Sequence, residues 1–231
     1  VIAYAVGLYF VMQVTALSTG KVDPERGLIY NTLSGFRYVY SHPVLRSVMY
    51  VVMFHCTLVM SFESLLPAVS DNQLGSGGEG VAYMHMMVGL GALVASIALA
   101  PVRGHGILGQ LFLISAVASS VGNVVLAIAV NLPFAMVGTV VIGISHTAFM
   151  TIATIMIQSV APDELRGRIT SIYLIHAGGL MSFSYFANGA LADIYLPSRI
   201  LAVGGIAFLL VIMGSWLVRT PRLVYKRGAF I

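Results

Sequence analysis

Long apolar stretches separated by short polar intervals dominate the pattern of the 231-residue chain. Several of them reach or exceed the about 20 residues that a helix needs to cross the hydrocarbon core of a bilayer. Because a helix satisfies its own backbone hydrogen bonds in lipid, each stretch is predicted to be a membrane-spanning helix. The predicted spans are residues 1–18, 44–68, 82–100, 107–130, 133–160, 169–191 and 198–218. The pattern therefore predicts an all-α, polytopic helical membrane protein with seven crossings.

Composition agrees with a membrane protein and excludes an ordinary soluble domain. The chain is 58% hydrophobic and 9% charged, with a mean hydropathy of +0.94, whereas about 25% of the residues in soluble domains are charged. The sequence opens inside an apolar run, with no initiator Met, no basic segment and no small-residue cleavage site. It does not resemble a signal peptide, and we expect Val1 to be a truncation point within a longer polypeptide.

Basic residues are distributed unevenly between the two sides of the predicted spans. Arg199 lies on one side. The other side holds Lys21, Arg26, Arg37, Arg46, Arg103, Arg166, Arg168, Arg219, Arg222, Lys226 and Arg227. Loops rich in Lys and Arg stay in the cytoplasm, so we expect a multi-pass protein of the plasma (inner) membrane with a cytoplasmic C-terminus. The pI of about 9.3 has the same origin, and no nucleic-acid partner is predicted from it.

The spans and the polar intervals suggest four parts. Residues 1–18 are expected to be the last helix of a preceding bundle, and residues 19–43 a cytoplasmic linker. Residues 44–218 are expected to form a six-helix transmembrane bundle, followed by a basic cytoplasmic tail at 219–231. Tyrosines among basic residues in the linker suit either a segment at the lipid headgroups or a plain solvated connector.

Glu63 is the one acidic residue predicted to lie well inside a span. A charge there costs at least about 2.5 kcal/mol unless it is neutralised, paired or exposed to a water-filled cavity. Its place along the helix corresponds to roughly 10 Å from the bilayer midplane toward the outside. One hypothesis is a site that binds protons from outside, and the other is an acid hydrogen-bonded near the outer interface.

Three histidines, His55, His146 and His176, are also predicted to lie within spans. An imidazole near its usual pKa can take part in a proton relay, whereas a hydrogen bond between helices is the commoner role of such a residue. Both interpretations stay open for each histidine. Because the histidines are scattered and the single cysteine, Cys56, lies within a span, no metal site, disulfide or cofactor is predicted.

Amide side chains and small residues within the spans indicate how the helices meet. The amides of Asn123, Gln158 and Asn188 could line a polar cavity or tie helices together, and we favour the tie. Glycines such as Gly91 and Gly143 permit helix backbones to approach closely.

Two loop segments carry a resemblance to a known family. Pro162-Asp-Glu-Leu-Arg166-Gly167-Arg168 resembles the loop between the tenth and eleventh helices of major facilitator superfamily transporters. Gly35-Phe-Arg37-Tyr38 through His42-Pro43-Val-Leu45-Arg46 resembles the lead-in to the seventh helix in the branch that contains enterobactin exporters and macrolide efflux proteins.

The resemblance implies a partial major facilitator fold, namely the C-terminal six-helix bundle plus one preceding helix. The N-terminal bundle of the same polypeptide would then be missing from the sequence, and two bundles would rock about a central cavity. A cytoplasmic latch is implied at Arg103, Asp163, Glu164, Arg166, Gly167 and Arg168. The loop at 101–106 departs from the family pattern because it lacks the family's Asp, so an ion pair of Arg103 with Asp163 or Glu164 is a hypothesis.

The resemblance also implies a transporter rather than an enzyme. The function that we infer from it is proton-coupled export of a small amphipathic molecule, siderophore-like or drug-like, by alternating access, with protons entering through Glu63. The expected partners are the small-molecule substrate, protons and the lipid bilayer. Two alternatives stay open, a membrane-embedded enzyme that uses intramembrane His and Glu and a helper subunit that does not itself transport.

Overall fold

Helices make up the secondary structure of the part of the chain that is described. The computed structural model describes residues 8–13, 28–102 and 104–228, and these ranges contain no strand. The predicted all-α class is therefore confirmed. In chain order the helical segments are α2 (Leu28–Ser41), α3 (Pro43–Leu58), η1 (Met60–Leu65), α4 (Leu66–Ala68), η2 (Val69–Gln73), α5 (Gly77–Leu99), α6 (His105–Ala127), α7 (Leu132–Val160), α8 (Arg166–Leu174), η3 (Ile175–Gly179), α9 (Leu180–Ala192), α10 (Pro197–Leu217) and α11 (Arg219–Arg227).

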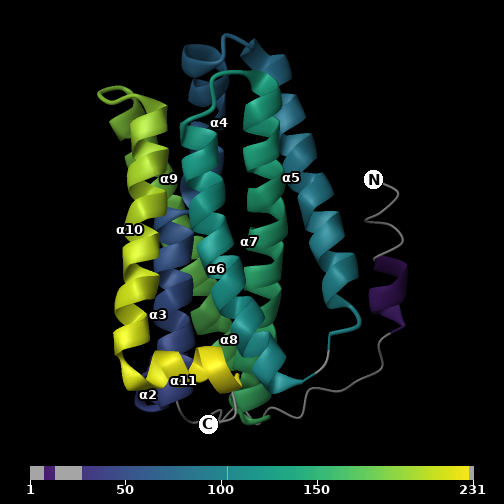
Figure 1. The fold of residues 1–231 in the computed structure, drawn as a ribbon. Helices are drawn as coiled ribbons and strands as arrows, with labels where there is room; N and C mark the ends of the chain where they lie inside the picture. Colours follow the sequence, from purple (N-terminus) through teal and green to yellow (C-terminus); the bar gives the residue numbers. More distant parts are fainter. Residues whose placement is uncertain (1–7, 14–27, 103, 229–231) are drawn as a thin grey trace.

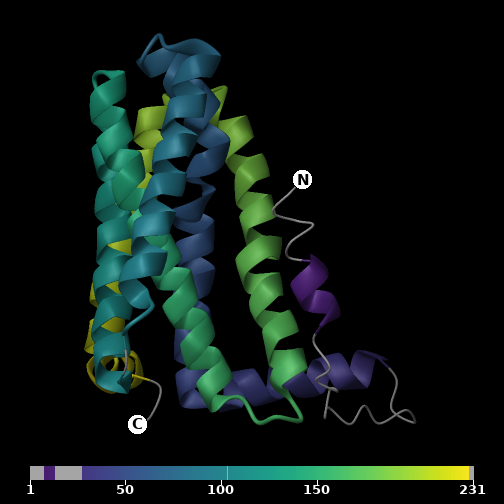
Figure 2. The ribbon, with the colours of Figure 1, turned by 90° about the vertical axis from the view of Figure 1, so that its right-hand side faces the viewer.

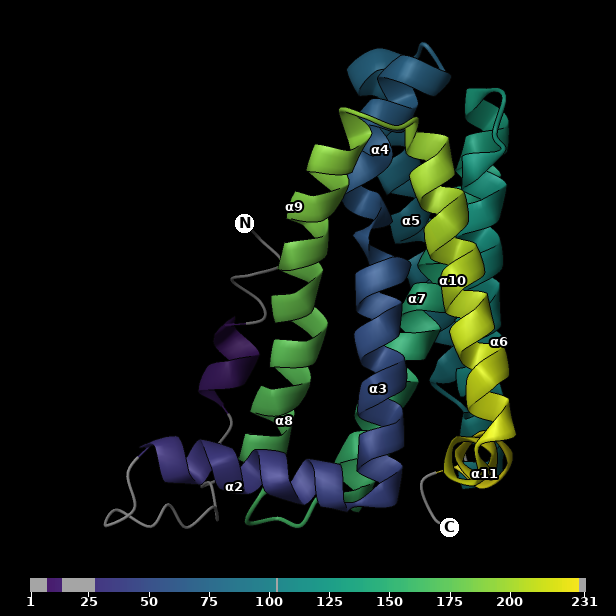
Figure 3. The ribbon, with the colours of Figure 1, turned by 90° about the vertical axis from the view of Figure 1, so that its left-hand side faces the viewer.

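The long helices stand side by side along one axis, whereas α2 and α11 lie across one end of the bundle (Figures 1 and 3). Packing runs from α5 to α7, from α7 to α6 and from α6 to α10. The helix α3 contacts α7, α9 and α10 and is the most deeply buried of the long helices. The residues of α3 therefore form the centre of the bundle.

Within the described residues, five helical runs are long and apolar enough to cross a membrane, namely Pro43–Gln73, Gly77–Leu99, Gly106–Ala127, Leu132–Val160 and Pro197–Leu217. A sixth run, α8 through α9, also extends along the bundle (Figure 2). Polar residues, concentrated in α8, make it less apolar than the other five. Of the span predicted at 1–18 the structure describes residues 8–13, of which 8–12 are helical. The rest of that prediction lies outside the described residues.

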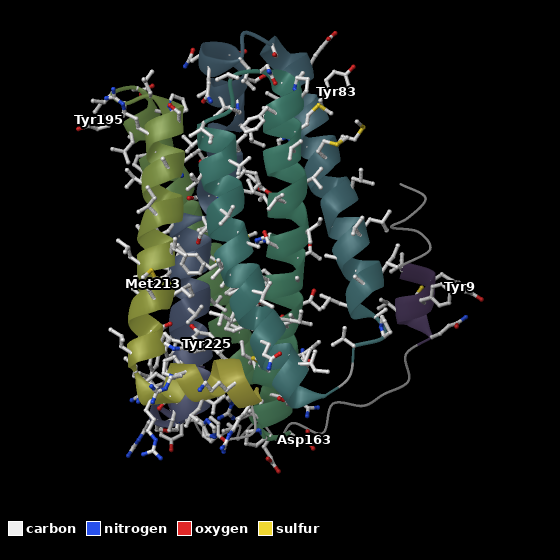
Figure 4. The ribbon with its side chains drawn as sticks, in the orientation of Figure 1. Tyr9, Tyr83, Asp163, Tyr195, Met213 and Tyr225 are labelled. Atoms are coloured by element: carbon white, nitrogen blue, oxygen red, sulfur yellow. The ribbon has the colours of Figure 1, made fainter. Side chains whose placement is uncertain are left out.

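The end of the bundle that carries α2 and α11 is called the basic end here. Of the described basic residues, Arg199 begins α10 at the opposite end, and the others lie at the basic end: Arg37, Arg46, Arg166, Arg168, Arg219, Arg222, Lys226 and Arg227. Figure 4 shows Asp163 and Tyr225 at this end and Tyr83 and Tyr195 at the other. The charge asymmetry read from the sequence is thus present in the folded chain.

Two short amphipathic helices occupy segments that the sequence suggested were a linker and a tail. The helix α2 packs against α8, where Gly35 approaches the side chains of Ile172 and Arg168. The helix α11 packs against α6 and buries Val224 and Tyr225. Both helices exist because one face is covered by the bundle, since isolated helices of this length are marginal in water.

The centre of the core is aromatic. The rings of His55 and Phe149 stack with centroids 4.0 Å apart, and those of Phe112 and Phe149 with centroids 4.6 Å apart. The ring of Phe208 meets His55 edge-on at 5.2 Å. All four side chains are fully buried. A polar imidazole therefore lies among apolar rings at the point where α3, α6, α7 and α10 meet.

Glycines bring the backbones of α5 and α7 into direct contact. A Cβ atom on Gly143 would collide with the carbonyl group of Val88, and one on Gly91 would collide with the carbonyl oxygen of Val140. Close approach of this kind drives helix association in lipid, where van der Waals packing replaces the hydrophobic effect.

Replacing Gly143 tests this contact. The change Gly143→Val forces α5 away from α7, and overpacking of this kind costs about 1–3 kcal/mol, so the midpoint of thermal unfolding in detergent should fall by several degrees. The matched control is Gly89→Val, because a Cβ on Gly89 meets nothing within 4 Å. Equal midpoints for the two variants would show that the contact does not stabilise the bundle.

Candidate functional site

The first long helix is interrupted inside the membrane-spanning run. α3 ends at Leu58, and after Val59 the chain tightens into the 3₁₀ segment η1 before continuing through α4 and the π turn η2. Pro67 explains the tightening, since proline has no N–H to bond the carbonyl of Glu63 four residues earlier. The amide of Leu66 donates to that carbonyl instead. Short 3₁₀ stretches inside helices often mark functional hinges.

Glu63 lies on η1 and faces α9. The hydroxyl of Tyr185 donates a hydrogen bond to Oε2 of Glu63 over 2.7 Å. Glu63 also interacts electrostatically with His146 of α7. The half-buried carboxylate thus has a donor on one neighbouring helix and a titratable ring on another. Such a pairing reduces the cost of holding an acid within the bundle.

His55 and His146 form a stacked pair next to this carboxylate. Their ring centroids are 5.3 Å apart and the planes are inclined by 12°. The hydroxyl of Ser119 donates to the carbonyl of Ala116, so its oxygen accepts from Nε2 of His55 at 3.2 Å. In a neutral ring this leaves Nδ1 of His55 without its hydrogen, and that buried atom has no hydrogen-bond partner among the described residues. The described chain therefore supplies no donor to Nδ1 of His55.

Nδ1 of His146 is likewise buried without a partner in the described chain. Tyr185 is hydrogen-bonded to Glu63, His146 lies within electrostatic range of Glu63, and the ring of His146 stacks on that of His55. These residues lie on α9, η1, α7 and α3. A carboxyl group and an imidazole can accept and release protons, which is the chemistry that a coupling site needs, whereas the Tyr185 hydroxyl serves as a hydrogen-bond donor to Glu63.

A cavity of about 160 Å³ lies between η1, α9 and α10. Asn123 and Asn188 both line it, together with Thr57 and Ser61. The Asn188 side-chain amide donates to the carbonyl of Ser61 at 3.1 Å and reaches Oγ of Ser64 at 3.4 Å. Asn188 therefore both borders a mainly apolar cavity and ties α9 to the interrupted helix. The amide of Asn123 donates to Ser119 on its own helix.

Gln158 and His176 lie away from this site. Gln158 is exposed and is not among the residues that line the cavity. Nδ1 of His176 donates to the carbonyl of Ile172 at 2.7 Å, so in the neutral ring Nε2 accepts from the Tyr40 hydroxyl at 2.6 Å. Burial, followed by the nearby Tyr50, raises the pKa of Tyr40, so its phenol keeps the hydrogen that it donates. His176 therefore ties the helix α2 to the π turn η3.

The described residues that the resemblance assigned to a latch lie at the basic end. The side chains of Asp163 and Arg166 form an ion pair with an O–N distance of 2.7 Å, and both are largely exposed. An exposed pair of this kind contributes about 1 kcal/mol or less to stability. Arg168 donates to the hydroxyl of Ser34 on α2 at 2.9 Å. Glu164 and Gly167 are exposed. Arg103 lies outside the described residues, so its pairing with Asp163 or Glu164 stays a hypothesis.

Sequence reasoning missed Tyr185 and Tyr40, the donors to Glu63 and His176. One signal for Tyr185 exists in the sequence. Tyr185 and Asn188 are three residues apart and therefore share a helix face, and a polar face in a membrane helix indicates a protein or water neighbour rather than lipid.

The fold and the interior titratable groups define a multi-pass helical membrane protein with ionisable residues inside its bundle. The sequence profile of the transmembrane secretion effector family, within the major facilitator superfamily, matches residues 1–226, so the chain belongs to this family. This confirms the superfamily that the two loop segments suggested.

A second similarity is to a curated transporter. The chain is 28% identical over 152 residues to the glucose transporter GlcP of Staphylococcus epidermidis, an alignment that covers 61% of this chain and 33% of that protein. The chain thus spans about a third of the length of this relative.

Removing the Asn188 amide tests the tie between α9 and η1. The change Asn188→Ala removes two interhelical contacts, and hydrogen bonds between membrane helices average about 0.6 kcal/mol, so thermal unfolding in detergent should begin at a lower temperature. Ser182→Ala is the control, because Ser182 is exposed and bonds only the carbonyl of Gly178 on its own helix. A variant as stable as this control would refute the tie.

Proposed function

We propose that the chain is the C-terminal bundle of a proton-coupled exporter that moves a small amphipathic molecule by alternating access. Family membership supports transport over the alternatives of a membrane-embedded enzyme and a helper subunit. The observation that carries the proton coupling is the bond from Tyr185 to Glu63 beside the His146 and His55 rings. The rest of the transport cavity would come from the N-terminal bundle of the same polypeptide.

The coupling step follows from the charge on Glu63. A deprotonated Glu63 accepts from Tyr185 of α9, and its charge favours a proton on His146 of α7, so that α7 and α9 are both attracted to η1. A proton arriving on Glu63 removes the charge and weakens both attractions. Because η1 is an interrupted helix, it can change its geometry with less loss of backbone hydrogen bonds than a regular helix. Protonation would thereby favour one of the two bundle arrangements.

The outward surface of α9 would face either lipid or the N-terminal bundle of the same polypeptide. Phe183 is 76% exposed and Phe186 is 82% exposed, on the same helix that carries Tyr185. Adjacent positions on one helix point in different directions, so α9 faces the interior of this bundle with Tyr185 and presents aromatic rings outward. Export, the siderophore-like or drug-like substrate and the enterobactin or macrolide branch rest on the resemblance of the loop segments.

The charge distribution supports an orientation. Positively charged loops stay in the cytoplasm, and all described basic residues except Arg199 lie at the basic end. We therefore place α2 and α11 in the cytoplasm and the segment between η2 and α5 outside, in a plasma (inner) membrane.

Neutralising Glu63 tests proton coupling. In the full-length protein reconstituted into liposomes, Glu63→Gln should abolish substrate accumulation driven by a proton gradient, because glutamine cannot gain or lose the proton. Downhill exchange of the same substrate should continue at a similar rate. Candidate amphipathic compounds and glucose would be compared as substrates, and the measurement is labelled substrate per vesicle with and without the gradient.

The control for this experiment is Glu79→Gln, an exposed acid in the first turn of α5. It should leave both rates unchanged. Uphill transport at the normal rate by Glu63→Gln would remove Glu63 from the coupling step. Loss of downhill exchange as well would assign the residue to substrate binding or folding instead.

Cysteine labelling tests the orientation. In intact cells an impermeant maleimide should label Ser76→Cys, whereas Lys226→Cys should react only after the membrane is permeabilised. The native Cys56 is buried and adds little background. The reverse labelling pattern would place the basic end outside.

A further inference from the structure

A groove of about 390 Å³ opens at the basic end between α3, α10 and α11. Arg46 and Thr220 border it where the helices leave the bundle, and Val51, Phe54 and Val211 continue its walls along the membrane-spanning runs. The groove is separate from the cavity beside Asn188, and no residue lines both.

The wall formed by α3 is charged at the mouth of the groove and becomes apolar along the helix. Arg46, Tyr50 and Phe54 are spaced by four residues and therefore lie on one face of the helix. The eight residue steps from Arg46 to Phe54 correspond to about 12 Å of helix. A ligand that fills the groove must be charged at one end and apolar along the rest of its length.

The helix α11 borders the mouth of the groove and is tied to α10 by side-chain contacts. The hydroxyls of Tyr225 and Ser215 are hydrogen-bonded at 2.8 Å, and the rings of Tyr225 and Trp216 stack with centroids 5.9 Å apart. Burial raises the pKa of Tyr225, so the phenol keeps its hydrogen at physiological pH. The angle between α10 and α11 is thus fixed by side chains as well as by the backbone.

The charge around the mouth has one sign. The exposed side chains of α11 include Arg219, Arg222, Lys226 and Arg227, and neither α11 nor the lining of the groove contains an acidic residue. An amphipathic helix with a basic outer face is typical of a segment at the surface of a membrane with anionic lipids. Basic pockets between membrane helices bind anionic headgroups.

We propose that this groove binds one anionic phospholipid, with the phosphate at Arg46 and the Thr220 hydroxyl and an acyl chain along Val51, Phe54 and Val211. A soluble anion would satisfy Arg46 but would leave the apolar walls without a partner. A zwitterionic lipid would fill the walls but would gain less from the basic rim. The proposal depends on the placement of the bundle in a membrane and not on the transport function.

The test measures lipid binding to the purified full-length protein in detergent after delipidation. Phosphatidylglycerol and phosphatidylcholine with identical acyl chains are titrated separately, and bound lipid is counted by native mass spectrometry. The wild type should retain one phosphatidylglycerol with at least fivefold higher affinity than phosphatidylcholine. Arg46→Gln should reduce the affinity for phosphatidylglycerol about fivefold, the factor that corresponds to one basic residue at an anionic surface.

Three further variants separate the charge from the groove and from the fold. Val211→Phe fills the apolar wall and should weaken both lipids. Val218→Trp does the same from an exposed position that also lines the groove, so it remains informative if Val211→Phe is unstable. Arg199→Gln, at the opposite end of α10, is the matched charge control and should bind as the wild type does.

Two outcomes would overturn the proposal. The first is an Arg46→Gln variant that keeps the wild-type preference for phosphatidylglycerol. The second is complete displacement of the lipid by glycerol phosphate at equal concentration, which would reveal a site for the headgroup anion alone. Failure of the proton-coupling experiment would leave this lipid measurement unaffected, so the two proposals can fail separately.

Discussion

The requirement that backbone polar groups be bonded within the protein governs the structure of the site. In lipid an unsatisfied carbonyl or amide costs several kcal/mol, and Pro67 removes one donor inside a membrane-spanning run. The chain responds by tightening into η1, where Leu66 bonds the Glu63 carbonyl. Asn188 of α9 then bonds the carbonyl of Ser61. The same carbonyl also accepts from the Ser64 hydroxyl at 2.7 Å, so the interruption that places Glu63 toward Tyr185 is held both from within η1 and by a neighbouring helix.

Most of the fold was predictable because length and hydropathy of an apolar stretch are strong signals in a membrane protein. Five predicted spans coincide with apolar helices of sufficient length. The run Arg166–Ala192 is a helix of spanning length whose polar residues, especially in α8, lower its hydropathy. The helices α2 and α11 were not predicted from the sequence, because each is stabilised by packing against the bundle, α2 against α8 and α11 against α6. The backbone of α11 at Val224 and Tyr225, for example, lies directly against Gly109 of α6.

The candidate site was predictable as a set of residues but not as an arrangement. An acid or a histidine inside an apolar run is visible in the sequence, so Glu63, His55 and His146 could all be named. Their grouping could not, because it joins positions 55, 63 and 146 through packing that no local pattern encodes. His176 looks similar in the sequence, yet a partner on α2 removes it from the group. Contacts across the bundle, rather than residue type, separate the two roles.

Two of the irregular segments, η1 and η3, lie where the helical run from α3 to η2 meets the run from α8 to α9. The irregular segment η1 thus packs against the regular helix α9, and the irregular segment η3 packs against the regular helix α3. Tyr185 and Asn188 hold the rod formed by α8 and α9 near η1, and His176 connects it to α2 at the basic end. A change of charge at Glu63 weakens its contact with Tyr185 near η1, while the hydrogen bond between His176 and Tyr40 of α2 stays in place. Under the proposed mechanism the rod would consequently tilt about η3, because paired glycines at 178 and 179 leave this turn with little side-chain bulk to resist bending.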